Sequence, residues 1–84
     1  MLHLIATSDQ MAQLLAASRR QAGLTQAEAA ARIGVSQSRI SALETDAAAL
    51  SVEQLLALCG AYNLQLQLRD KSQPAPDPAP SVEW

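Results

Sequence analysis

Four small polar side chains lie within six positions of one another in the middle of the chain: Ser36, Gln37, Ser38 and Ser41. Side chains of these types hydrogen-bond the exposed edges of DNA bases, and Gln37 can offer adenine a donor and an acceptor together. Taken one at a time, each is more simply explained as solvated helix surface. Their clustering at the start of one expected helix, directly after a tight turn, favours base contact and makes these four residues the candidate base-contacting set.

Several further residues are candidates for contacts to the DNA backbone. Arg20 and Arg32 can place positive charge beside phosphates. Arg39 lies on the same side as the polar cluster and can reach either a phosphate or a guanine. Gln26 begins the preceding helix, where backbone amides and the helix dipole already favour a phosphate. We therefore expect backbone contacts from Gln26, Arg20, Arg32 and Arg39.

The other side chains that could carry chemistry are assigned structural roles. Arg19 is expected to pair with Glu44 and so to tie two helices together. Cys59 lies on an apolar stripe and fits a small core residue better than a nucleophile or ligand. His3 is the only histidine and has no ligand-type residue at metal-binding spacing, so neither a metal site nor a cofactor is expected. Because the chain lacks a phosphate loop and a carboxylate pair in a plausible cleft, the sequence does not predict an enzyme.

Short helices with explicit start signals have to position these residues. Thr7, Thr25 and Ser51 are each followed three residues later by Gln or Glu, the pattern of a capping box, and Ser36 is a fourth N-cap candidate. The expected helices span residues 8–22, 26–33, 37–43 or 37–44, and 52–61. The turn between the second and third is so tight that they must cross steeply, which leaves one projecting outward as in a helix-turn-helix. The apolar residues expected to face the core from the first, third and fourth helices are Met11, Leu14 and Leu15, then Val35, Ile40 and Leu43, then Val52, Leu55, Leu56 and Cys59.

The pattern changes from helical to alternating at residues 64–69, where leucines alternate with glutamine and then arginine. Strict alternation predicts a β-strand with one apolar face, formed by Leu64, Leu66 and Leu68. A strand needs a partner for its backbone hydrogen bonds, and two are available: residues 3–5 of the same chain, or the same strand of a second copy. We favour the second copy, because a single chain would leave the three leucines on an open edge.

Length and composition set further bounds. The chain has 84 residues, of which 49% are hydrophobic although none is phenylalanine, so we expect one small, mainly α-helical domain with an aliphatic core. A core of this size is marginal, which favours an oligomer. The single cysteine cannot form an internal disulfide, and no apolar run is long enough for a membrane span or a secretory signal. These features predict a cytoplasmic protein that does not enter a membrane.

Charge and proline content divide the chain. The net charge is −2, but residues 9–44 sum to +1 and residues 45–84 to −3, so the positive charge lies on the expected DNA-binding part. So modest a positive face predicts weak non-specific binding, and useful affinity only for two copies on one site.

All four prolines fall within residues 72–80, and Trp84 ends the chain. We therefore expect a folded domain over residues 1–70 and a flexible Pro-rich tail over residues 71–84.

The motifs around the polar cluster resemble those of the Xre/Cro-type helix-turn-helix family of bacterial and phage repressors. The resemblance covers about residues 10–60 and rests on Arg19, AGLTQAE at 22–28, IGVSQ at 33–37, Ile40, Ser41, Leu43 and Glu44. It implies a lambda-repressor-like domain of four or five helices, with base contacts by the four clustered residues. It also implies that Gln26 is the glutamine with which the family begins its second helix, and that Arg19 and Glu44 form the family's Arg–Glu ion pair. The sequence departs from the family at Ala29, where leucine is usual and packing should be looser. It also lacks the usual glycine after Glu44, so the following loop cannot be inferred from the family.

A narrower resemblance is to the HipB-type antitoxins. It includes an Ile-x-x-Ser lead-in from Ile5 to Ser8, the alternating segment 64–68, and a tail that ends in Glu83-Trp84. It implies a homodimer joined by an intersubunit sheet, repression of its own operon through double-stranded operator DNA, and a HipA-like serine/threonine kinase toxin as partner. Two alternatives stay open. One is a free-standing Xre-type repressor without a toxin, and the other, suggested by the acidic total charge, is a protein-interaction module that has lost DNA binding.

Overall fold

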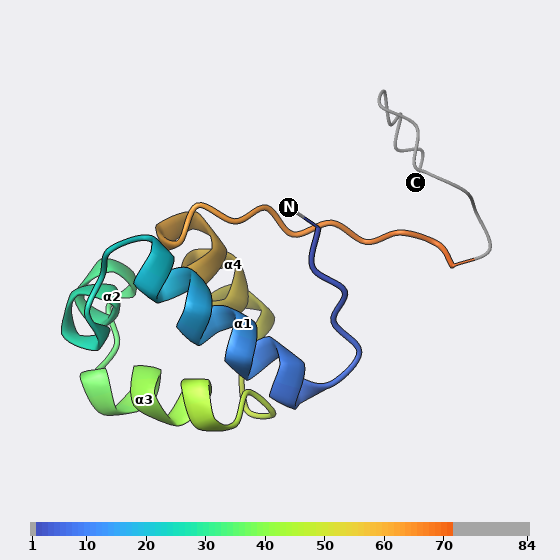
Figure 1. Cartoon of the computed structure of the whole chain (residues 1–84). Helices are drawn as coiled ribbons and strands as arrows, with labels where there is room; N and C mark the ends of the chain where they lie inside the picture. The colour runs from blue at the N-terminus through green and yellow to red at the C-terminus, as the bar shows by residue number, and fades with distance from the viewer. Residues whose placement is uncertain (1, 72–84) are drawn as a thin grey trace.

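Four α-helices make up most of residues 2–71, the part of the chain that this computed structural model describes (Figure 1). They are α1 (Ser8–Gln21), α2 (Gln26–Ile33), α3 (Gln37–Thr45) and α4 (Val52–Ala61). The predicted mainly α-helical fold is confirmed; α2 and α4 have the expected bounds, and α1 and α3 differ only at their C-terminal ends. Met1 and residues 72–84, which include the expected Pro-rich tail and Trp84, lie outside the described residues. None of the described helices is long and apolar enough to cross a membrane.

Side-chain caps begin all four helices, as the sequence predicts. The capping boxes at Thr7 and Thr25 are complete, but the one predicted at Ser51 is only half formed. Ser51 Oγ accepts a hydrogen bond from the Gln54 backbone N–H at 3.0 Å, whereas Gln54 Oε1 accepts from Arg39 Nη2 at 2.9 Å and does not return to Ser51. The side chain that would have closed a local cap therefore links α4 to α3.

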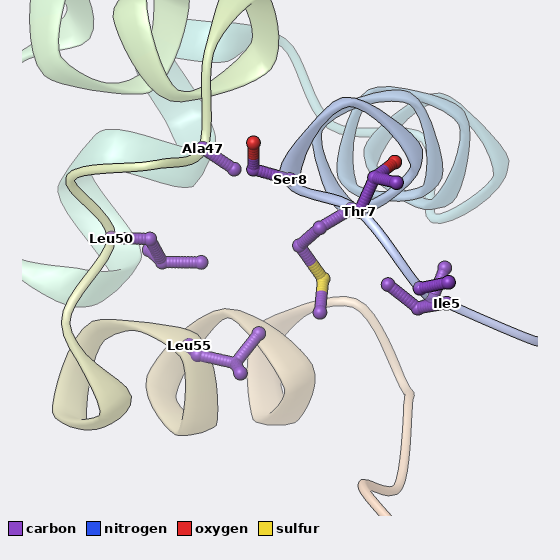
Figure 2. A pocket seen from close by; sticks show the side chains of 8 residues that line it. Ile5, Thr7, Ser8, Ala47, Leu50 and Leu55 are labelled. Atoms are coloured by element: carbon purple, nitrogen blue, oxygen red, sulfur yellow. The ribbon is translucent and has the colours of Figure 1, made fainter.

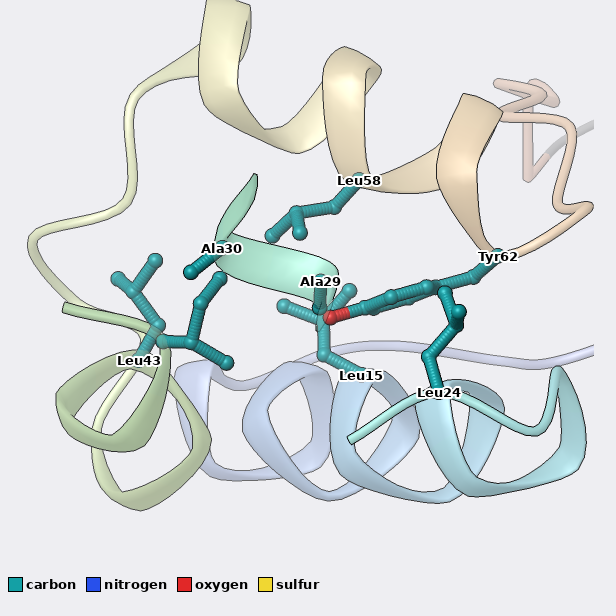
Figure 3. Packing of buried hydrophobic residues seen from close by; sticks show 8 residues of the cluster. Leu15, Leu24, Ala29, Ala30, Leu43, Leu58 and Tyr62 are labelled. Carbon is teal, nitrogen blue, oxygen red and sulfur yellow. The ribbon is translucent and has the colours of Figure 1, made fainter. Parts of the chain in front are cut away.

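The core lies where the helices meet and is aliphatic except for one tyrosine (Figure 3). Tyr62 directly follows α4 and is 4% exposed, a burial that no pattern in the sequence predicts. Ala29, where looser packing is expected, is completely buried in the same cluster. The largest fully buried side chains are Leu15, Ile40, Leu43 and Leu58.

The inward face of α4 differs from the prediction. Val52 and Leu56, both expected in the core, are 69% and 52% exposed. Leu58 is buried in their place, with Cys59 buried and Leu55 packed partly against the core. Most residues of this helix are apolar, so its periodicity does not distinguish one face from another. The exposed pair leaves apolar surface on α4, and Val52 lines the same groove as residues 62–68.

Residues 64–71 leave the helical domain as an extended segment (Figure 1). Leu64 packs partly against the core, whereas Leu66 and Leu68 are 43% and 93% exposed. No β-strand forms within residues 2–71, so the expected strand is not paired with residues 3–5 in the single chain. Residues 62–68 instead line an open groove of about 1080 Å³, together with Leu2 and Ile5 near the N-terminus and parts of α1 and α4.

Candidate nucleic-acid interface

The exposed face of α3 carries three of the four predicted base-contacting residues. Ile40 and Leu43 define its inward side, since they are 1% and 2% exposed. Successive residues are about 100° apart around an α-helix, so Ser38 and Ser41 fall on the outer side and Gln37 falls on the flank next to Glu44; all three are exposed. Among residues 2–71, the side chains of Gln37 and Ser41 have no hydrogen-bond partner. Their donors and acceptors are therefore available to a ligand.

Ser36, the fourth of these residues, begins α3 as its N-cap. Its Oγ accepts a hydrogen bond from the Arg39 backbone N–H at 3.1 Å. The same oxygen lies 3.1 Å from Ser38 Oγ, so the two hydroxyls share a hydrogen bond. Ser36 is exposed at the tip of the helix, but its first task is to satisfy a helix amide. The structure brings all four predicted residues together, and the side chains of Gln37 and Ser41 are the two without a hydrogen bond inside the described part of the protein.

A tight turn sets the angle between α2 and α3. Gly34 has a φ of +74°, in the left-handed region that favours glycine. The Val35 backbone N–H donates to Ala30 O at 3.0 Å and closes the end of α2. Ser36 then begins α3 at once. The predicted steep connection is thus formed, and α3 lies at the outer edge of the domain (Figure 1).

The predicted ion pair between Arg19 and Glu44 is present and is the centre of a small polar network. Arg19 Nε donates to Glu44 Oε2 at 2.6 Å, and Arg19 Nη2 donates to Glu44 Oε1 at 3.2 Å. Arg19 Nη1 donates to Leu24 O at 2.8 Å. Burial raises the pKa of the Glu44 carboxyl, but hydrogen bonds from Arg19 and Gln26 outweigh burial and hold this pKa below its ordinary value. The pair ties the end of α3 to α1.

Gln26, a predicted phosphate contact, belongs to the same network. Its Nε2 donates to Glu44 Oε1 at 3.1 Å, and the side chain is half-buried. A primary amide has two N–H donors, so one remains beside the backbone amides at the start of α2. Glu44 therefore fixes the direction in which the Gln26 amide points, a relation that sequence reasoning did not find.

The predicted backbone-contacting arginines fall into two groups. The side chains of Arg20 and Arg32 are exposed and have no hydrogen bond or ion pair with another residue of the 2–71 range. Arg39, by contrast, is half-buried and its Nη2 donates to two oxygens, Ala49 O at 3.0 Å and Gln54 Oε1 at 2.9 Å. The structure therefore leaves two of the three arginines available for phosphates and directs the third into the protein.

The loop between α3 and α4 is held by its own contacts, although the glycine usual in the family is absent. Asp46 Oδ1 accepts a hydrogen bond from the Ala48 backbone N–H at 2.9 Å, and the Leu50 backbone N–H donates to Ala47 O at 3.1 Å. Ala47 is 7% exposed. Figure 2 shows Ala47, Leu50 and Leu55 around a pocket of about 310 Å³ beside the start of α1.

Two short helices joined by a glycine turn, with a polar face exposed on the second, define a helix-turn-helix DNA-binding domain. The chain belongs to the helix-turn-helix family, which matches residues 15–68 and is of the Xre type. Its fold is similar to that of HipB. A HipB variant in complex with an O2 20mer is 28% identical, has a TM-score of 0.76, and covers 86% of this chain and 100% of its own.

Two further solved structures show the same likeness. HipB in a HipA–HipB–O2–O3 complex and HipB in an O4 20mer complex are each 27% identical, with a TM-score of 0.75, and each match covers 84% of this chain and 100% of the other. No curated protein matches the chain in sequence. The family and these structures confirm the predicted Xre-type, HipB-like resemblance.

Proposed function

We propose that this protein is a homodimeric, sequence-specific transcriptional repressor that acts in the cytoplasm as the antitoxin of a HipA-like serine/threonine kinase. The observation that carries the proposal is the exposed polar face of α3, with Gln37 and Ser41 uncommitted, on a fold whose solved relatives are HipB in complexes with O2 and O4 20mers. In this proposal each subunit places α3 in a major groove and represses its own operon.

The contacts proposed for DNA divide into two kinds. Base edges are read by Gln37, Ser38 and Ser41, with Ser36 at the tip of the same helix. Phosphates are contacted by Arg20, by Arg32 and by the free N–H of Gln26, which fix the domain on the duplex without reading sequence. The small positive charge of residues 9–44 supports this division, because it allows attraction without strong non-specific binding.

The proposed dimer rests on apolar surface that a single chain leaves uncovered. Leu66 and Leu68 project from the extended segment, and Val52 and Leu56 lie exposed on α4. Pairing of segment 64–68 with the same segment of a second copy would satisfy its backbone and cover Leu64, Leu66 and Leu68. A symmetric dimer then reads two half-sites about one helical turn apart.

The kinase partner is proposed because one of the similar HipB structures is a complex that includes HipA. A free-standing Xre-type repressor shares every DNA-binding feature described above, so the kinase has to be tested separately. If the gene beside this one encodes a HipA-like kinase, the two proteins should co-purify. A protein-interaction module without DNA binding is the alternative that the acidic net charge of −2 favours.

A gel shift on the DNA upstream of its own gene tests the central proposal. The wild-type dimer should shift this duplex at stated salt, and Gln37→Ala should weaken specific binding by about 1–3 kcal/mol while binding to random duplex stays nearly unchanged. Gln13→Ala, the same change at an exposed position of α1, is the control. No shift by a folded dimer refutes the repressor, whereas equal loss on both duplexes refutes the assigned reading face.

A further inference from the structure

Arg39 lies on the flank of α3, at the edge of its buried stripe. At about 100° per residue, Arg39 is about 40° from Leu43 on one side of this stripe, and Glu44 is about 40° from Ile40 on the other. Burial agrees with this geometry. Ile40 and Leu43 are buried, Arg39 and Glu44 are half-buried, and Ser41, on the side away from the buried stripe, is exposed. The buried stripe of α3 is thus bracketed by one charged side chain on each flank.

The two flanks are attached to different parts of the domain. Glu44 accepts hydrogen bonds from Arg19 of α1 and Gln26 of α2. Arg39 donates to Ala49 O in the α3–α4 loop and to Gln54 Oε1 of α4. Apolar contacts alone tolerate some rotation of a helix about its axis, because they are not directional. Polar contacts on both flanks oppose rotation in either sense.

We propose that Arg39 is a positioning residue for the DNA interface, which fixes the rotation of α3 through Ala49 and Gln54 and makes no phosphate contact. The inference rests on the proposed DNA-binding function. An α-helix with its side chains is about 10–12 Å across, so a rotation of about 20° moves the outer side chains by roughly 2 Å. That displacement exceeds what a hydrogen bond of about 2.7–3.2 Å tolerates. Loss of the Arg39 contacts therefore misplaces Gln37 and Ser41, although Arg39 itself does not contact DNA.

The test measures binding of the full-length protein to the upstream duplex and to a random duplex at several salt concentrations. The variants are Arg39→Met, Gln54→Ala and the double variant. Each single variant should bind the upstream duplex about threefold to tenfold more weakly, with random-duplex binding and the salt slope unchanged. The double variant should be no weaker than Arg39→Met, because Arg39→Met already removes the one contact that Gln54→Ala removes. Arg32→Met is the comparison, since loss of a phosphate contact should lower the salt slope by about one per subunit.

Two results of the binding experiment overturn the proposal. In the first, Arg39→Met lowers the salt slope and binds both duplexes more weakly, while Gln54→Ala binds as the wild type does. This result would make Arg39 a phosphate contact. The other is unchanged binding by both single variants. Gln54→Glu keeps an acceptor for Arg39 and should bind within roughly twofold of the wild type. Thermal unfolding identifies any variant that has simply lost its fold.

A wild-type protein that shifts neither duplex refutes the proposed function and not the contact. Hydrogen exchange in the free protein then decides. The Leu50 amide, which donates to Ala47 O in the loop that Arg39 holds, should exchange faster in Gln54→Ala than in Gln13→Ala. Equal exchange in the two variants overturns the positioning role.

Discussion

Replacing Glu44 by glutamine should destabilise the domain strongly, although the two side chains have nearly the same shape. Three donors converge on the two Glu44 oxygens: Arg19 Nε, Arg19 Nη2 and Gln26 Nε2. A glutamine has one acceptor oxygen and a donor NH₂ group, so at least one contact becomes donor against donor. The charge of Arg19, whose side chain is 10% exposed, also loses its counter-ion. Breaking a buried pair in this way costs about 3–5 kcal/mol.

The assay is thermal or urea unfolding followed by circular dichroism at fixed protein concentration. Taking about 3 kcal/mol, because one acceptor remains, and about 4–8 °C per kcal/mol for a domain of this size, Tm should fall by roughly 12–24 °C. Glu53→Gln is the matched control: Glu53 is exposed on α4, and its substitution should change stability by less than about 0.5 kcal/mol. A Glu44→Gln variant as stable as Glu53→Gln would refute the idea that this carboxylate ties the helices.

The same pair predicts how stability depends on pH. The pKa of Glu44 is lower in the folded protein than the ordinary value of about 4.3 expected when unfolded. Its contribution is therefore complete above that ordinary value and is lost as the pH falls through the lowered pKa of the folded state. Glu44→Gln should lack this part of the loss of folding stability at acid pH, whereas Glu53→Gln should keep it. If the stability of the two variants falls in the same way as the pH is lowered, the assignment is contradicted.

Three further results are expected. Leu68→Asp should weaken dimerisation roughly tenfold or more in sedimentation experiments and leave the helices intact, because it would bury a charge between two copies; an unchanged dimer would show that this segment is not in the interface. Ala29→Leu should cost about 1–3 kcal/mol of stability, because Ala29 is 0% exposed and the added atoms have to displace the core, whereas a more stable variant would indicate unfilled space beside it. Deleting residues 72–84 should leave dimerisation and operator binding unchanged, and loss of the dimer would mean that the tail is structural.

The helices were predictable because their signals are local. A Thr or Ser cap acts on amides within its own first turn, and Gly34 ends α2 through its own φ of +74°. These effects do not depend on what the helix packs against, so the bounds of α2 and α4 match the prediction. The Arg19–Glu44 pair was expected as a structural tie and was implied again by the family resemblance, which supplies long-range information that propensity lacks.

The features that the sequence did not predict all depend on packing between elements. A glutamine three residues after Ser51 has the same local pattern whether it closes a cap or reaches Arg39, and only the position of α3 decides. Gln26 likewise begins a helix whether its amide meets a phosphate or Glu44. The buried face of α4 was ambiguous because the helix is apolar on most sides. Tyr62, which adds its side chain to the core, lies one residue beyond the end of this helix and so outside its periodic pattern.

The proposed DNA face (Gln37, Ser38 and Ser41 on α3) and the apolar face (Leu66 and Leu68) lie on different sides of the domain, and this separation bears on regulation. Figure 1 shows α3 on one side of α1 and α4 and the extended segment 64–71 on the other, while the N-terminal residues run from beside that segment to the start of α1. The proposed DNA face needs only one chain, since its helix is capped and has polar contacts on both flanks. The apolar face is incomplete, because Leu66 and Leu68 stay exposed. A second copy can therefore cover that face without touching the bases, and affinity can be regulated through subunit association while each reading helix stays unchanged.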